Sequence, residues 1–281
     1  MLFLSYVSQS KNNYIMSDFE NNGYVIKSEF INAEACSEIQ STVSSSSPIV
    51  FEQFSSTPLA RGWGNLISNK RITELIKFDK INEITNELSG TNSSCNHLLI
   101  NNKPRWVGRD VEFHQEIFNR NTFAAGAELE KIKKEWIQVY IPLVDEDEMN
   151  GGLCIFENSH KFGELNHEDI YDGNGRHKRR VKAEDLDTLD KKGCKLKCLK
   201  LKAGDLLCFS TFLVHASANN LEGKDRMSIV MQYKPDSFEP DKEIYNKEID
   251  YRSKYIINHL QTRLNDENEV KDKYKDVGIN K

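Results

Sequence analysis

The chain has 281 residues, of which 38% are hydrophobic and 29% charged, and its formal net charge is −5. This length and composition predict one large globular domain, and the mildly acidic total argues against nucleic acid as the main partner, since phosphate binding usually requires a basic face. The chain contains no run of about 18 apolar residues, which argues against a membrane span, and the opening segment lacks the basic start and cleavage site of a signal peptide.

The first third of the chain is predicted to be mainly helical. Residues 1–16 form a loose N-terminal arm, and residues 17–92 form a helical prelude that includes one short strand, Tyr24–Lys27, after the Asn22-Gly23 turn. Helices are expected at Asn32–Val43 and within Asn69–Leu88, with a serine-rich break between them.

Residues 93–238 change to short apolar or alternating runs separated by turn signals, which predicts strands. About eight strands after helices predict a mainly β protein with flanking helices and a double-stranded β-helix core, which is a jelly roll of the cupin kind. The remainder, 239–281, is a charged tail with a possible outer helix at Glu248–Leu264. The eight predicted strands are His97–Asn101, Phe113–Phe118, Trp136–Val144, Gly152–Glu157, Cys194–Leu201, Asp205–Phe209, Phe212–His215 and Met227–Tyr233.

The six cysteines are scattered along the chain, and only Cys194 and Cys198 lie close in sequence. A single Cys-x-x-x-Cys pair is a poor zinc signature. We therefore predict reduced structural thiols in a cytoplasmic protein, with a redox or metal role as the alternative.

A candidate metal site combines His114, Glu116 and His215. On a strand, residues two apart face the same way, so His114 and Glu116 would offer two ligands to one metal. His215 lies in a late apolar run and would supply the third ligand. Two histidines and one carboxylate form the facial triad of non-haem iron oxygenases. Taken singly, each histidine is more often an ordinary core residue, so the prediction depends on the combination.

Arg226 follows His215 by eleven positions and opens a predicted strand, which the turn at 222–224 would fold back beside the strand that carries His215. A buried guanidinium needs a partner, and its fork matches a carboxylate bidentately. We predict that Arg226 binds the distal carboxylate of 2-oxoglutarate, with help from the Ser217 hydroxyl. The alternative is a salt bridge to an acid of the protein itself.

From about residue 18 to residue 235, these features resemble the phytanoyl-CoA dioxygenase family. His114-Gln115-Glu116 stands where the family has His-x-Asp, and Asn150-Gly151 looks like its Asn-Gly turn. The resemblance implies Fe(II), 2-oxoglutarate and O2 as cofactors, and it places Gln138 and Tyr140 in the cosubstrate pocket. Tyr140 stands where the family commonly has tryptophan.

The substrate is expected to be a small polar molecule, with no nucleic acid or membrane partner. Predicted substrate contacts are Gln115, Trp106, Arg109, Arg179 and Arg180. The last two belong to a basic run, Arg176–Arg180, which would capture an anionic substrate; the alternative is a solvated loop.

The leading prediction is therefore a 2-oxoglutarate-dependent hydroxylase. Glu116 argues against halogenation, because the family's halogenases leave that position vacant, but it does not exclude desaturation or ring formation. The alternatives are a non-catalytic β-barrel that binds a metal or small molecule and a cupin-like metal isomerase or hydrolase. Neither alternative needs a carboxylate anchor made of Arg226 and Ser217.

Overall fold

A computed structural model describes residues 16–46, 49–54, 57–64, 66–106, 108, 110–116, 135–170, 178–239 and 243. The predicted arm and the predicted helix Glu248–Leu264 lie outside this part, apart from residue 16, and the division of the chain into one domain with an arm and a tail stays a prediction. Within the described part, no helix is long and apolar enough to cross a membrane.

Two antiparallel sheets form the body of the protein, which confirms the predicted mainly β, jelly-roll class. The strand lengths are short and the connections pass between sheets, as expected for this architecture. The large sheet has the order β1 (Tyr24–Lys27), β11 (Leu206–Ser210), β6 (Ile137–Pro142), β13 (Arg226–Pro235), β4 (Ser93–Lys103), β3 (Thr57–Trp63) and β2 (Ile49–Phe54). The small sheet has the order β10 (Leu196–Cys198), β7 (Leu153–Phe156), β12 (His215–Ser217) and β5 (Val111–His114).

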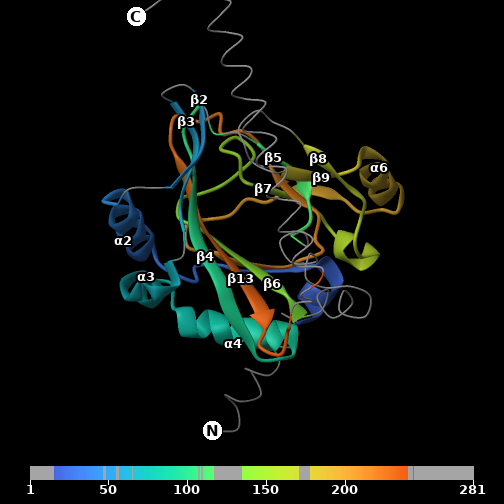
Figure 1. The fold of residues 1–281 in the computed structure, drawn as a ribbon, viewed down its shortest axis with the longest axis horizontal. Coiled ribbons are helices and arrows are strands. Elements are labelled where there is room, and N and C mark those ends of the chain that lie inside the picture. Colours follow the sequence, from blue (N-terminus) through green and yellow to red (C-terminus); the bar gives the residue numbers. More distant parts are fainter. Residues whose placement is uncertain are drawn as a thin grey trace, which may run out of the picture.

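Three helices cover the outer face of the large sheet: α2 (Ala33–Ser44), α3 (Lys70–Leu75) and α4 (Phe78–Ser89) (Figure 1). Asn32 and Asn69 begin α2 and α3, and each side chain accepts a backbone N–H of the first turn. On the other side of the molecule, α6 (Ala183–Lys191) lies beside the hairpin of β8 (His167–Ile170) and β9 (Lys178–Val181) (Figure 1). The described part also contains a helix over residues 16–22 and two 3-10 turns, η1 (Leu66–Ser68) and η3 (Ser159–Phe162).

Strand β13 shows how the large sheet divides its two faces. Met227, Ile229 and Met231 belong to the core shared with the helices. Because side chains alternate along a strand, Arg226 and Ser228 face the other way, toward the small sheet. The outer face is thus an ordinary apolar core, whereas the inner face carries polar groups that need partners.

Three predictions about the elements were wrong in part. The prelude contains more helix than strand, as predicted, but it also carries β2 and β3, which were not predicted; with β1 they join the large sheet, which extends beyond the predicted core of residues 93–238. Strands β12 and β13 are not neighbours: the turn at 222–224 carries the chain from the small sheet to the large one. The basic run ends in strand β9 rather than lying in a loop.

The prediction of reduced cysteines was wrong for one pair. Cys154 and Cys198 form a disulfide across 44 residues, while Cys36, Cys95, Cys194 and Cys208 are free. The pairing of β7 with β10 sets the two cysteines directly opposite each other, where neighbouring side chains come close. The cysteines therefore no longer support the predicted cytoplasmic compartment.

Candidate active site

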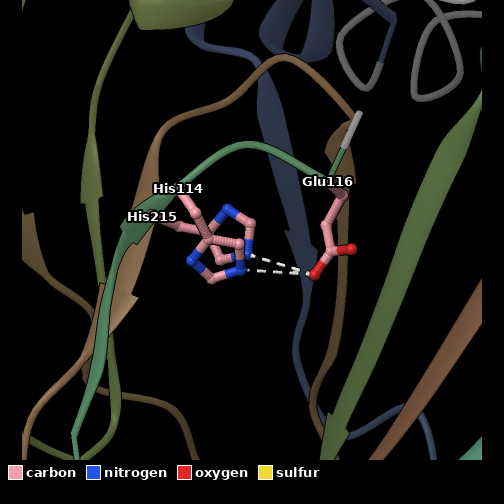
Figure 2. A group of neighbouring side chains, drawn as sticks. All are labelled: His114, Glu116 and His215. Carbon is pink, nitrogen blue, oxygen red and sulfur yellow. Dashed lines mark hydrogen bonds and ion pairs between the residues drawn. The ribbon is translucent and has the colours of Figure 1, made fainter. Parts of the chain in front are cut away.

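His114, Glu116 and His215 come together in one cluster, as the sequence predicts, with one ligand atom from each within 4.8 Å of the others. Nε2 of His114 lies 3.4 Å and Nε2 of His215 lies 3.8 Å from the same Glu116 oxygen, Oε1. Figure 2 shows the two rings side by side, both facing that carboxylate. All three groups point at a single position, which is the arrangement that a metal ion requires.

The small sheet brings the two histidines together. His114 ends β5 and His215 begins β12, and the two residues lie directly opposite each other with ring centroids 4.2 Å apart. Glu116 is not on the strand, so the predicted strand Phe113–Phe118 was wrong at Gln115 and Glu116, while its last two residues lie outside the described part. The chain turns there, and the Glu116 N–H donates to the Thr211 carbonyl at 3.1 Å. Glu116 reaches the cluster because of this turn rather than because of strand alternation.

A backbone carbonyl fixes each histidine ring. Nδ1 of His114 lies 2.7 Å from the Glu112 carbonyl oxygen, and Nδ1 of His215 lies 2.9 Å from the Leu213 carbonyl oxygen. A carbonyl can only accept, so Nδ1 carries a proton in either charge state of the ring, and Nε2 is the nitrogen that presents a lone pair once the ring is neutral. Such bonds set the tautomer and ring orientation of histidines that bind metals.

The charges of the cluster favour an ionised carboxylate. Burial raises the pKa of Glu116, but the hydrogen bonds and charges of the two histidines outweigh it and hold the pKa well below the ordinary value. Burial lowers the pKa of His114, yet Glu116 outweighs burial and leaves it raised. At His215, burial and the neighbouring His114 leave the pKa lowered. A carboxylate beside a neutral imidazole is a donor set that binds divalent iron.

Gln115, predicted as a substrate contact, has a different role. Its side chain is 1% exposed, and its amide nitrogen donates to the carbonyls of Gly163 at 2.8 Å and Phe212 at 2.7 Å. Its amide oxygen accepts from the Leu165 N–H at 2.9 Å. The side chain is fully used in joining three backbone segments next to the cluster, so we do not retain it as a substrate contact.

Arg226 lies buried on the inner face of the large sheet, at the start of β13. Its Nη1 donates to the hydroxyl of Tyr140, to Glu146 Oε1 at 3.3 Å and to Ser228 Oγ at 3.4 Å. The Tyr140 hydroxyl lies 2.8 Å from both oxygens of Glu146, whose side chain is fully buried. A protein acid therefore does pair with Arg226, which was the alternative to a cosubstrate partner.

This pairing leaves part of the guanidinium available. Among the described residues only Nη1 of Arg226 makes hydrogen bonds, and the buried Nε has no partner. Buried donors are rarely left unsatisfied, so an orphaned Nε indicates a missing acceptor. Nε and one terminal nitrogen of a guanidinium form a fork that fits a carboxylate. The free edge of Arg226 thus fits a second carboxylate.

Lys103 joins this region to the small sheet. It lies directly opposite Arg226 in the pairing of β4 with β13, and its Nζ donates to Ser217 Oγ at 2.8 Å and to the Ser217 carbonyl at 3.2 Å. A hydroxyl that accepts from an ammonium keeps its own proton to donate elsewhere. Ser217 is therefore prepared to donate to an anion, as its predicted role requires.

Ser217, the predicted partner of Arg226, lies one strand step from His215. Ser217 follows His215 by two residues on β12, which corresponds to about 7 Å along a strand. On the large sheet, Phe209 packs against the His215 ring with centroids 5.0 Å apart and lies directly opposite Gln138, while Tyr140 is two residues further along β6. The separation of about 7 Å between His215 and Ser217 matches the length of a five-carbon dicarboxylate.

The remaining predicted contacts are less well supported. Trp106 is 66% exposed, and its backbone N–H, not its indole, donates to the Glu222 carbonyl in the turn before β13, away from the metal cluster. Arg180 is paired with Glu168 at 2.7 Å and with Glu112 at 3.5 Å, which favours the alternative of a solvent-facing basic segment. Arg109 and the side chain of Arg179 lie outside the described residues.

Sequence reasoning missed Glu146 and Lys103. Glu146 is one of four consecutive acids, Asp145–Glu148, and such a run is usually a solvated loop. It is buried because its backbone forms a bridge with Leu201, which turns this one side chain inward. No pattern in the sequence distinguishes it from its neighbours.

Comparisons with known proteins identify the family of the chain. The family model "Phytanoyl-CoA dioxygenase (PhyH)" matches residues 19–228. No curated protein matches the chain. Similar solved structures include the epimerase SnoN from nogalamycin biosynthesis in complex with Fe3+, alpha ketoglutarate and nogalamycin RO, with a TM-score of 0.62, 14% identity and coverage of 81% of this chain and 84% of that one.

Two further structures were obtained with a cosubstrate bound. EctD from S. alaskensis with 2-oxoglutarate and 5-hydroxyectoine has a TM-score of 0.60 and 14% identity over 78% of this chain and 74% of that one. HygX from Streptomyces hygroscopicus with nickel and 2-oxoglutarate has a TM-score of 0.57 and 13% identity over 81% of this chain and 88% of that one. At these identities the structures establish a shared fold. Because the family model covers most of its length, the chain belongs to the phytanoyl-CoA dioxygenase family, whose members use Fe(II), 2-oxoglutarate and O2.

Proposed function

We propose that this protein is a 2-oxoglutarate-dependent hydroxylase in which His114, Glu116 and His215 hold Fe(II). The observation that carries the proposal is the convergence of these three ligand atoms within 4.8 Å, in a protein whose large sheet also carries a buried guanidinium with an unpartnered Nε. With both groups bound, the iron and 2-oxoglutarate would use O2 to convert a C–H bond to an alcohol, while 2-oxoglutarate becomes succinate and CO2.

The chain's own groups would bind and orient these partners. The carbonyls of Glu112 and Leu213 would keep the two rings in the tautomer that binds metal. The free edge of Arg226 and the Ser217 hydroxyl would take the distal carboxylate of 2-oxoglutarate, so that its keto acid end reaches the iron. Gln138 and Tyr140, on the inner face of β6, would line the path between them.

A small polar substrate fits the inner face best. Beyond the anchor, β4 and β13 carry polar side chains on the face opposite the helices, where Asn101 lies opposite Ser228 and His97 opposite Gln232. Of these four residues, Ser228 and Gln232 are buried, Asn101 is partly buried and His97 is exposed. A polar substrate could hydrogen-bond to the groups that it reaches on this face. Hydroxylation is the proposed outcome, although structural neighbours include an epimerase and a carbocyclase.

Succinate release tests the proposal. The full chain, supplied with Fe(II), 2-oxoglutarate, O2 and a panel of small polar metabolites, should form succinate, and the true substrate should gain one oxygen atom in equal amount. The matched control is Glu116→Ala, which removes the carboxylate ligand and should lose both products. A metal-loaded wild-type chain that makes no succinate with or without candidate substrates would overturn the proposal. Succinate formed with a desaturated, cyclised or epimerised product would retain the enzyme class and correct the outcome.

A further inference from the structure

The buried acid Glu146 raises a question that the proposed function leaves open. Its side chain is fully buried, and it shares Arg226 with the position proposed for the distal carboxylate of 2-oxoglutarate. Two bridge hydrogen bonds hold its backbone: the Glu146 N–H donates to the Leu201 carbonyl at 2.8 Å, and the Leu201 N–H donates back at 3.0 Å. The backbone therefore holds the carboxyl group beside Arg226.

Like charges placed together in a buried pocket oppose each other's ionisation. When Arg226 accepts a second carboxylate on its free edge, an ionised Glu146 on the first edge makes binding of that carboxylate less favourable. A neutral Glu146 avoids this repulsion and still accepts a hydrogen bond from Arg226 while its oxygens remain next to the Tyr140 hydroxyl. The geometry alone therefore favours the neutral form of Glu146 when a dicarboxylate is bound.

We propose that Glu146 is an internal competitor for Arg226 that sets the affinity for 2-oxoglutarate, so that cosubstrate binding is coupled to proton uptake by Glu146. This inference rests on the proposed function, because it takes Arg226 as the site of the distal carboxylate. It assigns to Glu146 the role of setting the affinity of the cosubstrate site, and the metal ligands do not share this role.

The groups that face Glu146 define the sign and size of the effect. Burial raises its pKa, while Arg226 from β13, Tyr140 from β6 and Lys103 from β4 lower it. The hydroxyl of Tyr140 stays neutral, since burial raises its pKa further. Lys103 opposes the repulsion between the two carboxylates, so we expect uptake of less than one full proton. The neighbouring Asp145 is exposed and paired with Lys202 at 2.7 Å.

The test is titration calorimetry of the full-length chain loaded with Mn(II), which does not support turnover, with 2-oxoglutarate as the ligand. Wild-type binding in buffers of different ionisation enthalpy should reveal proton uptake, and the affinity should fall as the pH rises through the raised pKa of Glu146, by up to about tenfold per pH unit. Glu146→Gln should bind about tenfold more tightly at neutral pH and lose this pH dependence.

Two controls isolate the second carboxylate. The ligand 2-oxopentanoate has the same keto acid end without a distal carboxylate, so its binding should be insensitive to Glu146→Gln and should show only the proton effects of the metal cluster. Asp145→Asn removes an equal charge one residue away and should change neither affinity. The wild-type calorimetry requires no variant, so it decides the matter even if Glu146→Gln folds poorly.

The outcomes separate the two claims. Equal pH profiles for the two ligands, or Glu146→Gln binding that is unchanged or weaker, would overturn the competitor role and leave Glu146 as a support for Arg226. A wild-type chain that binds neither keto acid would instead overturn the proposed function itself.

Discussion

The proposed metal cluster and the proposed Arg226 anchor belong to different sheets, and the protein builds them in different ways. The metal ligands come from strand ends and a turn of the small sheet, and the side chains of His114 and Glu116 are 20% and 22% exposed. The anchor comes from central strands of the large sheet, and Arg226 and Glu146 are 6% and 0% exposed. A metal site requires open positions for its partners, whereas an anchor gains strength from burial.

This difference predicts that the two regions fail independently. Damage to the cluster should remove the metal and leave the fold intact, because its ligands stand at the end of a sheet. Damage to the anchor should remove the cosubstrate and also weaken the fold, because it leaves charges unpaired in the interior.

The largest effect is expected for His215→Ala. Loss of a residue that only orients a metal ligand typically lowers metal affinity about 10- to 100-fold. Loss of one of the three ligands themselves should therefore lower metal affinity by at least about 100-fold and should abolish succinate formation. Metal content after dialysis and the thermal unfolding midpoint measure the two parts. His97→Ala, a histidine outside the cluster, should retain the metal. Full metal occupancy in His215→Ala would contradict the assignment of this ligand.

Arg226→Met should separate the anchor from the cluster. We expect 2-oxoglutarate affinity to fall about 100-fold, because about two charge-assisted hydrogen bonds to its distal carboxylate are lost. Metal binding should not change. Because Glu146 would stay buried without its cation, the free energy of unfolding should also fall by about 3 kcal/mol.

The double variant Arg226→Met/Glu146→Gln sharpens this prediction, because it removes both charges. Stability measured by urea unfolding should largely return, while 2-oxoglutarate affinity should not. If both returned together, Arg226 would act on the fold alone and not as the cosubstrate anchor.

Gln115→Leu tests what supports the cluster. Its three hydrogen bonds to backbone groups would be lost, which should cost about 3 kcal/mol of unfolding free energy at about 1 kcal/mol each. The matched control is Gln40→Leu, which loses a single hydrogen bond, of 2.9 Å, from the Gln40 amide to the Leu143 carbonyl. This variant should lose about a third as much unfolding free energy. Equal losses of unfolding free energy in Gln115→Leu and Gln40→Leu would show that the hydrogen bonds of Gln115 do not hold the chain next to the cluster.

The smallest effect is the pH dependence of stability due to Glu146. Burial raises its pKa in the folded protein above the value of 4.5 for an unfolded chain, so the folded state holds the proton more tightly. Its contribution to stability is therefore largest at low pH and declines as the pH rises from 4.5 through the folded-state pKa. Relative to Glu146→Gln, the wild type should lose stability as the pH rises from 4.5 through the raised pKa of Glu146, measured by urea unfolding. Parallel curves for the two proteins would contradict this.

The same contrast explains what the sequence predicted. His114, Glu116 and His215 carry chemistry that few residue types share, and short motifs mark them, so the cluster was predicted in full. Arg226 was predicted because it opens a strand at a fixed distance after His215. The strand that was to carry Glu116 was wrong, because a turn and not a periodic pattern places that residue.

The anchor was predicted only in part because its other members depend on long-range pairing. Glu146 is indistinguishable from the acids around it until its bridge with Leu201 turns it inward. The disulfide depends on the register that sets Cys154 opposite Cys198, two residues separated by 44 positions. Strands β2 and β3 were missed because only the edge of the large sheet gives them a partner.

We propose that His114, Glu116 and His215 hold an iron and that Arg226 anchors a keto acid bound to it. Anaerobic titration of the full chain with Fe(II) and 2-oxoglutarate tests it most directly, because a keto acid chelated to Fe(II) gives a charge-transfer absorption band in the visible. We predict this band for the wild type, its loss in His215→Ala, and a markedly higher 2-oxoglutarate requirement in Arg226→Met. Absence of the band in the wild type at saturating Fe(II) and 2-oxoglutarate would contradict the claim.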